Sequence, residues 1–210
     1  MSFSMGTTSD YLALTPFTPI VPVTISAWCR ATSAADRTIW HQRIGDSSMN
    51  SSIRLMLYGG KVRADHTSGG TNSAAYSTGS FPTDGTWFHC CGYLPATTSR
   101  IAYLNGVAGT TNTATRSSFT PDRHRLFSLA PLSASGMLDQ VAEIGVWTAA
   151  LTAAEILALS RGFPPTKIRP QSLRNYVRGL RTLRTLVGEP GTISGTSSPE
   201  DFHPRMYYQA

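Results

Sequence analysis

The sequence predicts an all-β protein in which two antiparallel sheets pack face to face. From Tyr11 to Trp147 it contains short runs rich in β-branched and aromatic residues, separated by clusters of Gly, Ser, Thr, Asn and Pro. No helical pattern separates these runs, which argues against a parallel sheet with crossover helices. Hydrophobic residues make up 40% of the chain and charged residues 14%. This balance supplies a core and excludes a charged coiled coil or a charge-driven disordered chain.

Seven segments have the composition expected of strands. They are Val23–Cys29, Ile53–Tyr58, Lys61–Ala64, Trp87–Leu94, Arg100–Leu104, Arg125–Leu129 and Leu138–Trp147. Gly59 and Gly60 link the second and third segments as a hairpin, and Asn105 with Gly106 indicates a tight turn after the fifth. Many short strands at this spacing favour a sandwich or jelly roll.

A short closing helix is expected to begin after Thr152. Thr152 at the N-cap and Glu155 three residues later form a capping box, which satisfies two backbone N–H groups at the start of a helix. Gly162 fits the left-handed position after the helix, and the prolines at 164 and 165 forbid its continuation. We therefore expect a jelly-roll body over residues 1–162 and a C-terminal arm over residues 163–210.

The spacing of apolar residues in the arm predicts one amphipathic helix over residues 171–187. The apolar positions are Leu173, Val177, Leu180, Leu183 and Val187. At 100° per residue, Arg174, Arg178 and Arg181 form a separate stripe about 120° away from the apolar one. The chain ends in a Gly-, Ser- and Pro-rich stretch that contains Phe202, Tyr207 and Tyr208. An apolar tail of this kind is expected to be held by the body or by neighbouring subunits.

The net charge of +6 is concentrated in the arm. Residues 161–184 carry seven basic and no acidic side chains, whereas residues 1–160 carry ten basic and nine acidic ones. The arginine stripe is compatible with a solvated face, with an acidic protein surface or with nucleic acid. Arginine is used almost to the exclusion of lysine, which favours carboxylate contacts, and Tyr176 is the sole aromatic interleaved with it. We expect a protein interface formed by Arg174, Tyr176, Arg178, Arg181, Phe202, Tyr207 and Tyr208.

Cysteine usage indicates a reducing compartment. Cys29, Cys90 and Cys91 cannot all pair, and the side chains of two neighbours on a strand point to opposite faces. We expect three thiols that serve as small core residues. The N-terminal residues lack the cationic and apolar regions of a signal peptide, and no apolar run approaches the roughly 20 residues that cross a bilayer. A chain that stays in the cytoplasm of its cell is therefore expected.

Six blocks in order resemble the laminin-G-like, concanavalin A-like family. They are DYLAL at 10–14, TISAW at 24–28, GTWFH at 85–89, AYLNGV at 102–107, GMLDQVAEIGVW at 136–147 and ALTAAEI at 150–156. The resemblance implies a two-sheet antiparallel jelly-roll sandwich whose first strand lies near its last, followed by a short helix. We expect Trp28, Trp87, Tyr103 and Trp147 to fill the space between the sheets.

The sequence offers no catalytic site. The family's glycosidases use closely spaced carboxylates on one strand, and here Asp139 and Glu143 share a face only within a block that the family uses structurally. Members of the family often hold structural calcium near the position of Asp139, and Asp10 would approach it if the terminal strands pair. The five histidines lack metal-ligand spacing, and a packed His89 is expected. We therefore expect no enzyme activity, no cofactor and no metal.

The arm is the element that points to a function. From Phe163 to Pro204 it also resembles the tails that follow such jelly rolls in proteins of tailed bacteriophages. We expect a non-enzymatic structural protein of a phage virion, above all a capsid decoration or cement protein attached through its arm. It would be assembled in the host cytoplasm as a homo-oligomer, would contact capsid or other virion proteins, and would bind neither membrane nor nucleic acid.

The alternative is a carbohydrate-binding module, or a tail or fibre component that recognises host-surface glycan. Sugar stacking requires aromatic rings exposed on a sheet. The sequence leaves open whether Tyr58 and Tyr76, which lie in polar surroundings, provide such rings.

Overall fold

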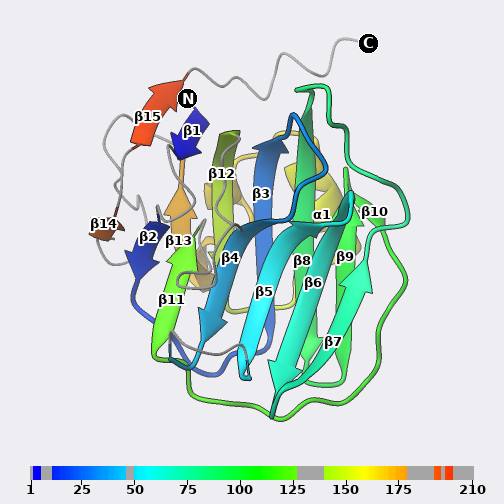
Figure 1. The fold of residues 1–210 in the computed structure, drawn as a ribbon, viewed down its shortest axis with the longest axis vertical. Helices are drawn as coiled ribbons and strands as arrows, with labels where there is room; N and C mark the ends of the chain where they lie inside the picture. The colour runs from blue at the N-terminus through cyan, green and yellow to red at the C-terminus, as the bar shows by residue number, and fades with distance from the viewer. Residues whose placement is uncertain are drawn as a thin grey trace.

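The computed structural model describes residues 2–5, 11–45, 50–126, 140–178, 192–194 and 197–200. Within these ranges the chain forms two antiparallel sheets that lie one behind the other (Figure 1). The predicted all-β sandwich with one short α-helix is confirmed. None of the helices in the described part of the chain is long and apolar enough to span a bilayer.

The first sheet has the strand order β10-β9-β8-β3-β12-β1-β15, and β13 also pairs with β12. Its strands are β1 (Ser2–Met5), β3 (Val23–Arg30), β8 (Trp87–Ala96), β9 (Ser99–Leu104), β10 (Val107–Ala108), β12 (Gln140–Trp147), β13 (Leu173–Val177) and β15 (Ser197–Glu200). The first strand of the chain, β1, pairs with β12, as the family resemblance implies.

The second sheet has the order β14-β2-β11-β4-β5-β6-β7 and faces the viewer in Figure 1. Its strands are β2 (Tyr11–Leu14), β4 (Arg37–Arg43), β5 (Ser52–Tyr58), β6 (Lys61–Ser68), β7 (Thr71–Tyr76), β11 (Arg123–Leu126) and β14 (Thr192–Ser194). The predicted hairpin at Gly59 and Gly60 joins β5 to β6, and both glycines have positive φ.

The core lies between the two sheets. Successive side chains of a strand point to opposite faces, so Ile25, Ala27 and Cys29 of β3 meet Leu55 and Ala64 of the other sheet. Large rings in this core come from Phe17, Trp40, Phe81 and Phe88. The four rings that the sequence predicts for this core are not among them, so that prediction is wrong.

Trp28, Trp87, Tyr103 and Trp147 are buried, but outside the inter-sheet core. Trp28 alternates with Ala27 and Cys29, so its ring lies on the outer face of the first sheet with Trp87 and Ala142. Tyr103 and Trp147 belong to another cluster on that outer face, beneath the helix α1 (Ala153–Ser160). The alternation of the strands, rather than ring size, decides which layer a side chain joins.

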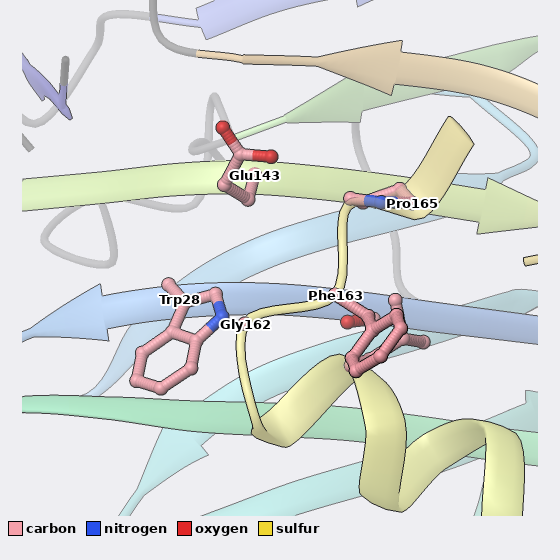
Figure 2. A pocket seen from close by; sticks show the side chains of 7 residues that line it. Trp28, Glu143, Gly162, Phe163 and Pro165 are labelled. Carbon is pink, nitrogen blue, oxygen red and sulfur yellow. The ribbon is translucent and has the colours of Figure 1, made fainter. Parts of the chain in front are cut away.

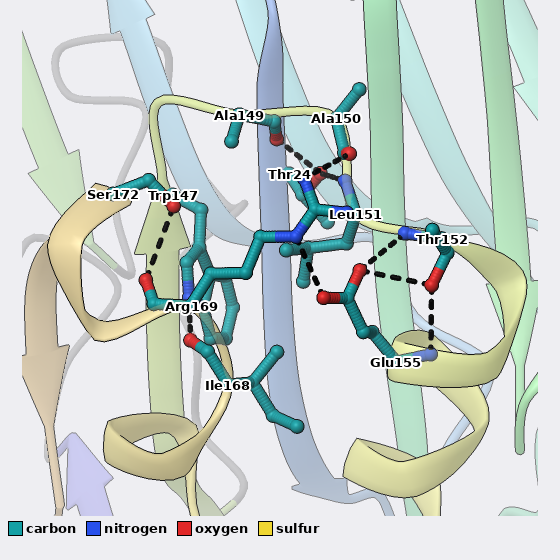
Figure 3. Close-up of polar contacts among 10 residues, drawn as sticks. All are labelled: Thr24, Trp147, Ala149, Ala150, Leu151, Thr152, Glu155, Ile168, Arg169 and Ser172. Atoms are coloured by element: carbon teal, nitrogen blue, oxygen red, sulfur yellow. Dashed lines mark hydrogen bonds and ion pairs between the residues drawn. The ribbon is translucent and has the colours of Figure 1, made fainter.

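The helix α1 begins as predicted. Thr152 accepts a hydrogen bond from the backbone N–H of Glu155, and the Glu155 carboxylate accepts one from the backbone N–H of Thr152 (2.6 Å). Two 3₁₀ turns follow, η1 (Pro165–Lys167) and η2 (Pro170–Ser172). Figure 3 shows how Arg169 reaches back to Glu155, with Nε and Oε1 2.6 Å apart. Trp147 Nε1 donates to the carbonyl oxygen of Ile168 (2.7 Å), which fastens this connection to β12.

The predicted amphipathic helix over residues 171–187 is wrong in its described part, because residues 173–177 form the strand β13. Leu173 and Val177 are four residues apart, a spacing that keeps them on one side of a helix but fits the two-residue period of a strand equally well. Tyr176 and Val177 favour strands, and β12 offers a backbone edge for them. The first part of the expected arm therefore extends the first sheet, and residues 179–187 lie outside the described ranges.

Candidate functional site

The outer face of the second sheet carries charged and aromatic side chains where β5, β6 and β7 lie side by side. Ile53, Leu55 and Leu57 point into the core, so Arg54 and Tyr58 of β5 point away from it. The same alternation in β6 and β7 places the remaining outward side chains on this face. They include Lys61, Arg63, Asp65 and Tyr76.

A buried carboxylate organises this face. Asp65 has no exposed surface and accepts hydrogen bonds from Arg54 Nε (2.8 Å, to Oδ1) and Arg54 Nη2 (2.6 Å, to Oδ2). Arg63 Nη2 lies 2.9 Å from the same Oδ2. Two guanidinium groups share one carboxylate, so the cluster retains a net positive charge and a fixed geometry.

Two tyrosine rings flank Arg63 and form what we call the aromatic platform, Tyr58 with Tyr76. Arg63 Cζ lies 4.6 Å from the ring centroid of Tyr58 and 5.7 Å from that of Tyr76. The two centroids are 6.4 Å apart and the ring planes are inclined at 50°. Tyr58 is 40% exposed and Tyr76 is 38% exposed. The platform therefore presents apolar ring surface to solvent above a cation that fixes the rings in place.

A groove of about 430 Å³ adjoins the platform along β7. It lies between this edge strand and the chain that follows β10, which passes around the outside of β7 (Figure 1). Its lining residues are Lys61, Ala74, Ala75, Tyr76, Ser77, Thr78, Thr110, Thr111 and Asn112. Tyr76 belongs to both features, so platform and groove form one continuous surface, and a groove of this volume suits a small ligand.

Asn112 and Gly109 hold the far wall of this β7 groove. Asn112 Nδ2 donates to the carbonyl oxygen of Ala74 (2.9 Å), and Asn112 Oδ1 accepts from the Ser73 hydroxyl (2.7 Å). The backbone N–H of Gly109 donates to the carbonyl oxygen of Ala102 (2.8 Å). A Cβ on Gly109 would lie 2.0 Å from the carbonyl oxygen of Tyr76, so a side chain at position 109 would displace the wall.

Lys61 connects the charged cluster to the groove. It lies two residues before Arg63 on β6 and is directly opposite Tyr58 in the register. Its Nζ donates to the carbonyl oxygens of Ser77 (3.4 Å) and Thr78 (3.1 Å), which directs the ammonium group to the groove. An ammonium has three N–H donors, so one stays available at this point.

A second recess lies on the outer face of the first sheet, beside Trp28, and Figure 2 shows it from close by. Its volume is about 10 Å³, far below the roughly 300 Å³ of typical ligand pockets, and it is lined in part by Trp28, Glu143 and Phe163. The Tyr176 hydroxyl donates to Glu143 Oε2 (2.5 Å), and Arg178 Nε lies 3.7 Å from Oε1. Burial raises the pKa of Glu143, while the contacts with Tyr176 and Arg178 oppose that rise. Glu143 therefore fastens β13 to β12.

Ser26 and His89 are a hydrogen-bonded pair, with Oγ and Nε2 2.7 Å apart. Burial lowers the pKa of His89 to about 3, so its imidazole is neutral at physiological pH. Within the described ranges, His89 Nδ1 has no hydrogen-bond partner and so no carboxylate orients the ring as in a catalytic triad. The packed His89 expected from the sequence is confirmed.

The structure places only part of the interface predicted from the sequence. Arg174 is exposed, whereas Tyr176 is buried against Glu143 and Arg178 lies beside the same carboxylate. Arg181, Phe202, Tyr207 and Tyr208, as well as Asp10 and Asp139, lie outside the described residues. The interface therefore stays a prediction. Nor does any group of three or more His, Cys, Asp or Glu side chains in the described ranges form a metal site.

Sequence reasoning missed the Arg54, Arg63 and Asp65 cluster. A signal was present in β6, where Lys61, Arg63 and Asp65 alternate with Val62 and Ala64. This alternation shows that the polar residues share one face of the strand. It does not show which neighbouring strands bring the tyrosines beside them, because that depends on the pairing with β7.

Solved structures share this fold at low sequence identity. A candidate carbohydrate-binding protein from Bacteroides ovatus superposes with a TM-score of 0.70 and 15% identity, over 96% of this chain and 61% of its own. A heptameric SAP-like pentraxin from Limulus polyphemus superposes with a TM-score of 0.65 and 11% identity, over 94% of this chain and 93% of its own. A third structure is domain 4 of an extracellular GH43 arabinanase from Geobacillus stearothermophilus, solved with arabinotriose. It superposes with a TM-score of 0.55 and 18% identity, over 66% of each chain. The chain thus spans about three fifths of the Bacteroides protein.

The sequence itself identifies the family. No curated protein matches the chain. A family model described as the concanavalin A-like lectin/glucanases superfamily matches residues 6–157, which is more than half of the chain and includes both β6 and β12. The protein with this aromatic platform and β7 groove therefore belongs to the concanavalin A-like lectin/glucanases superfamily.

Proposed function

We propose that this protein is a non-enzymatic glycan-binding module that contacts saccharide through the aromatic platform and the β7 groove. The observation that carries the proposal is the pair of half-exposed rings, Tyr58 and Tyr76, fixed on a rigid sheet beside a groove of ligand size. The apolar faces of a sugar ring stack on such rings, while its hydroxyl groups require polar partners. Thr78, Thr110 and Thr111 in the groove supply these partners.

The chemistry of the site supports binding rather than hydrolysis. Glycoside hydrolysis requires two carboxyl groups flanking the bond that breaks. The carboxylate found in the cluster, Asp65, is fully buried and held by two guanidinium groups, so it cannot exchange protons with a substrate. The described lining of the β7 groove contains no Asp or Glu.

Proteins of the same fold support this proposal. The Bacteroides ovatus protein is named for carbohydrate binding, and the arabinanase domain was solved with arabinotriose. Because their identity to this chain is low, the structural similarity shows a common fold alone. The residues that would bind saccharide here are therefore inferred from the geometry of this chain.

A place in a bacteriophage virion stays a prediction. It depends on contacts of residues 179–210, which lie outside the described ranges except for the backbone of β14 and β15. Glycan binding by the body is compatible with it, because a tail or fibre component can carry such a module.

The test is binding of the full chain to a glycan array, followed by calorimetry with the best ligand. We expect Tyr58→Ala and Tyr76→Ala each to weaken binding about tenfold, which corresponds to about 1.4 kcal/mol. Phe163→Ala is the matched control, because Phe163 is 57% exposed and lines the recess on the outer face of the first sheet. Unchanged binding by the double variant Tyr58→Ala/Tyr76→Ala would overturn the assignment of the site, and an array without any ligand would overturn the function.

A further inference from the structure

We propose that the saccharide bound at this site is acidic, with a carboxylate or sulfate group that pairs with Lys61. This inference rests on the proposed function and specifies its ligand class. It follows from three features of the described residues: the charge of the cluster, the position of the Lys61 ammonium, and the kinds of hydrogen-bonding groups in the groove.

The cluster beside the platform is positively charged. Lys61, Arg54 and Arg63 contribute three positive charges and Asp65 one negative charge. Both oxygens of Asp65 are occupied by guanidinium groups, so this carboxylate offers nothing to a ligand. An anionic group that approaches the platform is attracted by the remaining charge, whereas a neutral sugar gains nothing from it.

Arg63 supplies a charge that water screens poorly. It is 9% exposed, its Nε has no hydrogen-bond partner in the described part of the chain, and its Nη2 is bound to Asp65 and Asn72. Because the guanidinium lies among the two tyrosine rings, the effective dielectric constant around it is lower than in water. Arg63 therefore acts as a positioning residue, which holds the rings and adds to the field that an anion meets.

Lys61 supplies the direct contact. Its Nζ is held at the groove by the carbonyl oxygens of Ser77 and Thr78, and one N–H donor stays available. A half-buried ammonium that is already held in place loses little freedom when it pairs with an anion, so such a pair is stronger than an exposed, mobile one.

The described lining of the groove contains a cationic donor, Lys61, and no anionic acceptor. Sugar hydroxyl groups donate as well as accept, and carboxylates are the strongest acceptors for them. The described groove lining has no carboxylate, and both side-chain amide atoms of Asn112 are already bonded to β7. A ligand that brings its own anionic oxygen atoms matches the Lys61 ammonium better than a neutral one.

The experiment compares matched ligands that differ in charge. Calorimetry of the full chain would use an oligogalacturonate and the same oligomer with its carboxyl groups methyl-esterified, together with dextran sulfate and dextran. We expect at least one acidic ligand to bind ten times more tightly than its neutral partner, and this preference to shrink as salt rises from low to high concentration. The pair that shows the preference identifies the anion as a carboxylate or a sulfate.

Two variants separate a specific contact from general charge attraction. Lys61→Met should remove the preference, so that the acidic ligand and its neutral partner bind with equal affinity, while Lys61→Arg should retain most of the preference. Lys167→Met makes the same change in net charge at an exposed position of η1, which packs against β12 and β13 of the first sheet, and should have no effect.

The outcomes distinguish this inference from the proposed function. Equal affinity for acidic and neutral partners would overturn the inference that the ligand is acidic and would leave the proposed glycan binding intact. An equal loss of this preference in Lys61→Met and Lys167→Met would also overturn the inference, because the attraction would then depend on net charge alone. Failure of every saccharide on the array would instead overturn the proposed function itself.

Discussion

Replacing Asp65 by Asn tests how the charged face of the second sheet is held together. The substitution keeps the size of the side chain and one acceptor oxygen, but it removes the negative charge that Arg54 and Arg63 share. The two guanidinium groups then lie close to each other without a counter-charge. The aromatic platform depends on Arg63, so the consequence should reach Tyr58 and Tyr76.

The size of the effect follows from burial. Asp65 is fully buried, and it makes three charge-assisted contacts between 2.6 and 2.9 Å long. Removing one partner of a buried ion pair costs about 3–5 kcal/mol, because the other charge stays buried. We expect about 3 kcal/mol, since Asn keeps an acceptor and both arginine side chains retain 11% exposure through which water can reach them.

Urea denaturation followed by tryptophan fluorescence measures this cost. With a slope of about 2 kcal/mol per M, the midpoint of Asp65→Asn should fall by about 1.5 M. Asp122→Asn is the control. Asp122 is half exposed and its Oδ2 lies 3.7 Å from Arg123 Nη1, so loss of this exposed ion pair should cost under about 1 kcal/mol. A cost for Asp65→Asn as small as that of the control would refute the view that a buried carboxylate organises this face.

Three further predictions concern other parts of the structure. Gly109→Ala should lower the free energy of unfolding in urea by about 1–3 kcal/mol and weaken saccharide binding, because the new Cβ would lie 2.0 Å from the carbonyl oxygen of Tyr76. Gly79→Ala is the control and should do neither, because its Cβ would lie 3.7 Å from the Leu104 side chain. Burial raises the pKa of Glu143 above its usual 4.5, so the folded state binds more protons than the unfolded state in the range above pH 4.5, and wild-type stability falls as pH rises through that range. The free energy of unfolding of Glu143→Gln relative to wild type should therefore increase from pH 4 to pH 7, and a difference independent of pH would contradict this. The three thiols are buried, and burial raises the pKa of Cys91, so a thiol reagent at pH 8 should titrate them only after unfolding; rapid reaction of native protein would show that the core around them is open.

Much of the fold is readable in the sequence because local signals agree there. The hairpin of β5 and β6 has two glycines at its turn, and α1 has a capping box formed by Thr152 and Glu155. Such signals involve neighbours in the chain, so they do not depend on the rest of the structure.

Other elements depend on contacts that a local pattern does not contain. The strand β4 reads RTIWHQR, and all its residues are buried although three of them are Arg or His. A register shift between Thr38 and Trp40 interrupts its alternation, and Gln42 lies opposite the core residue Ile53, so no alternation between buried and exposed positions marks it as a strand. In β13, a spacing shared by helix and strand is decided by pairing with β12.

The candidate site shows the same limit. Tyr58 and Tyr76 are separated by two strand connections, and only the pairing of β5, β6 and β7 brings their rings to 6.4 Å. The sequence identifies them as rings in polar surroundings, but their exposure and the cation between them come from tertiary structure.

The segment that walls the β7 groove has a further consequence for solubility. An unprotected border strand displays backbone groups that can recruit a foreign strand and start aggregation. Here Arg116 Nη2 donates to the carbonyl oxygen of Asn72 (3.0 Å) and Asn112 Nδ2 to that of Ala74 (2.9 Å), so two acceptors on this border of the second sheet are already occupied from within the chain. The rim that presents the tyrosines can thus stay open to a long polymer without inviting fibril growth.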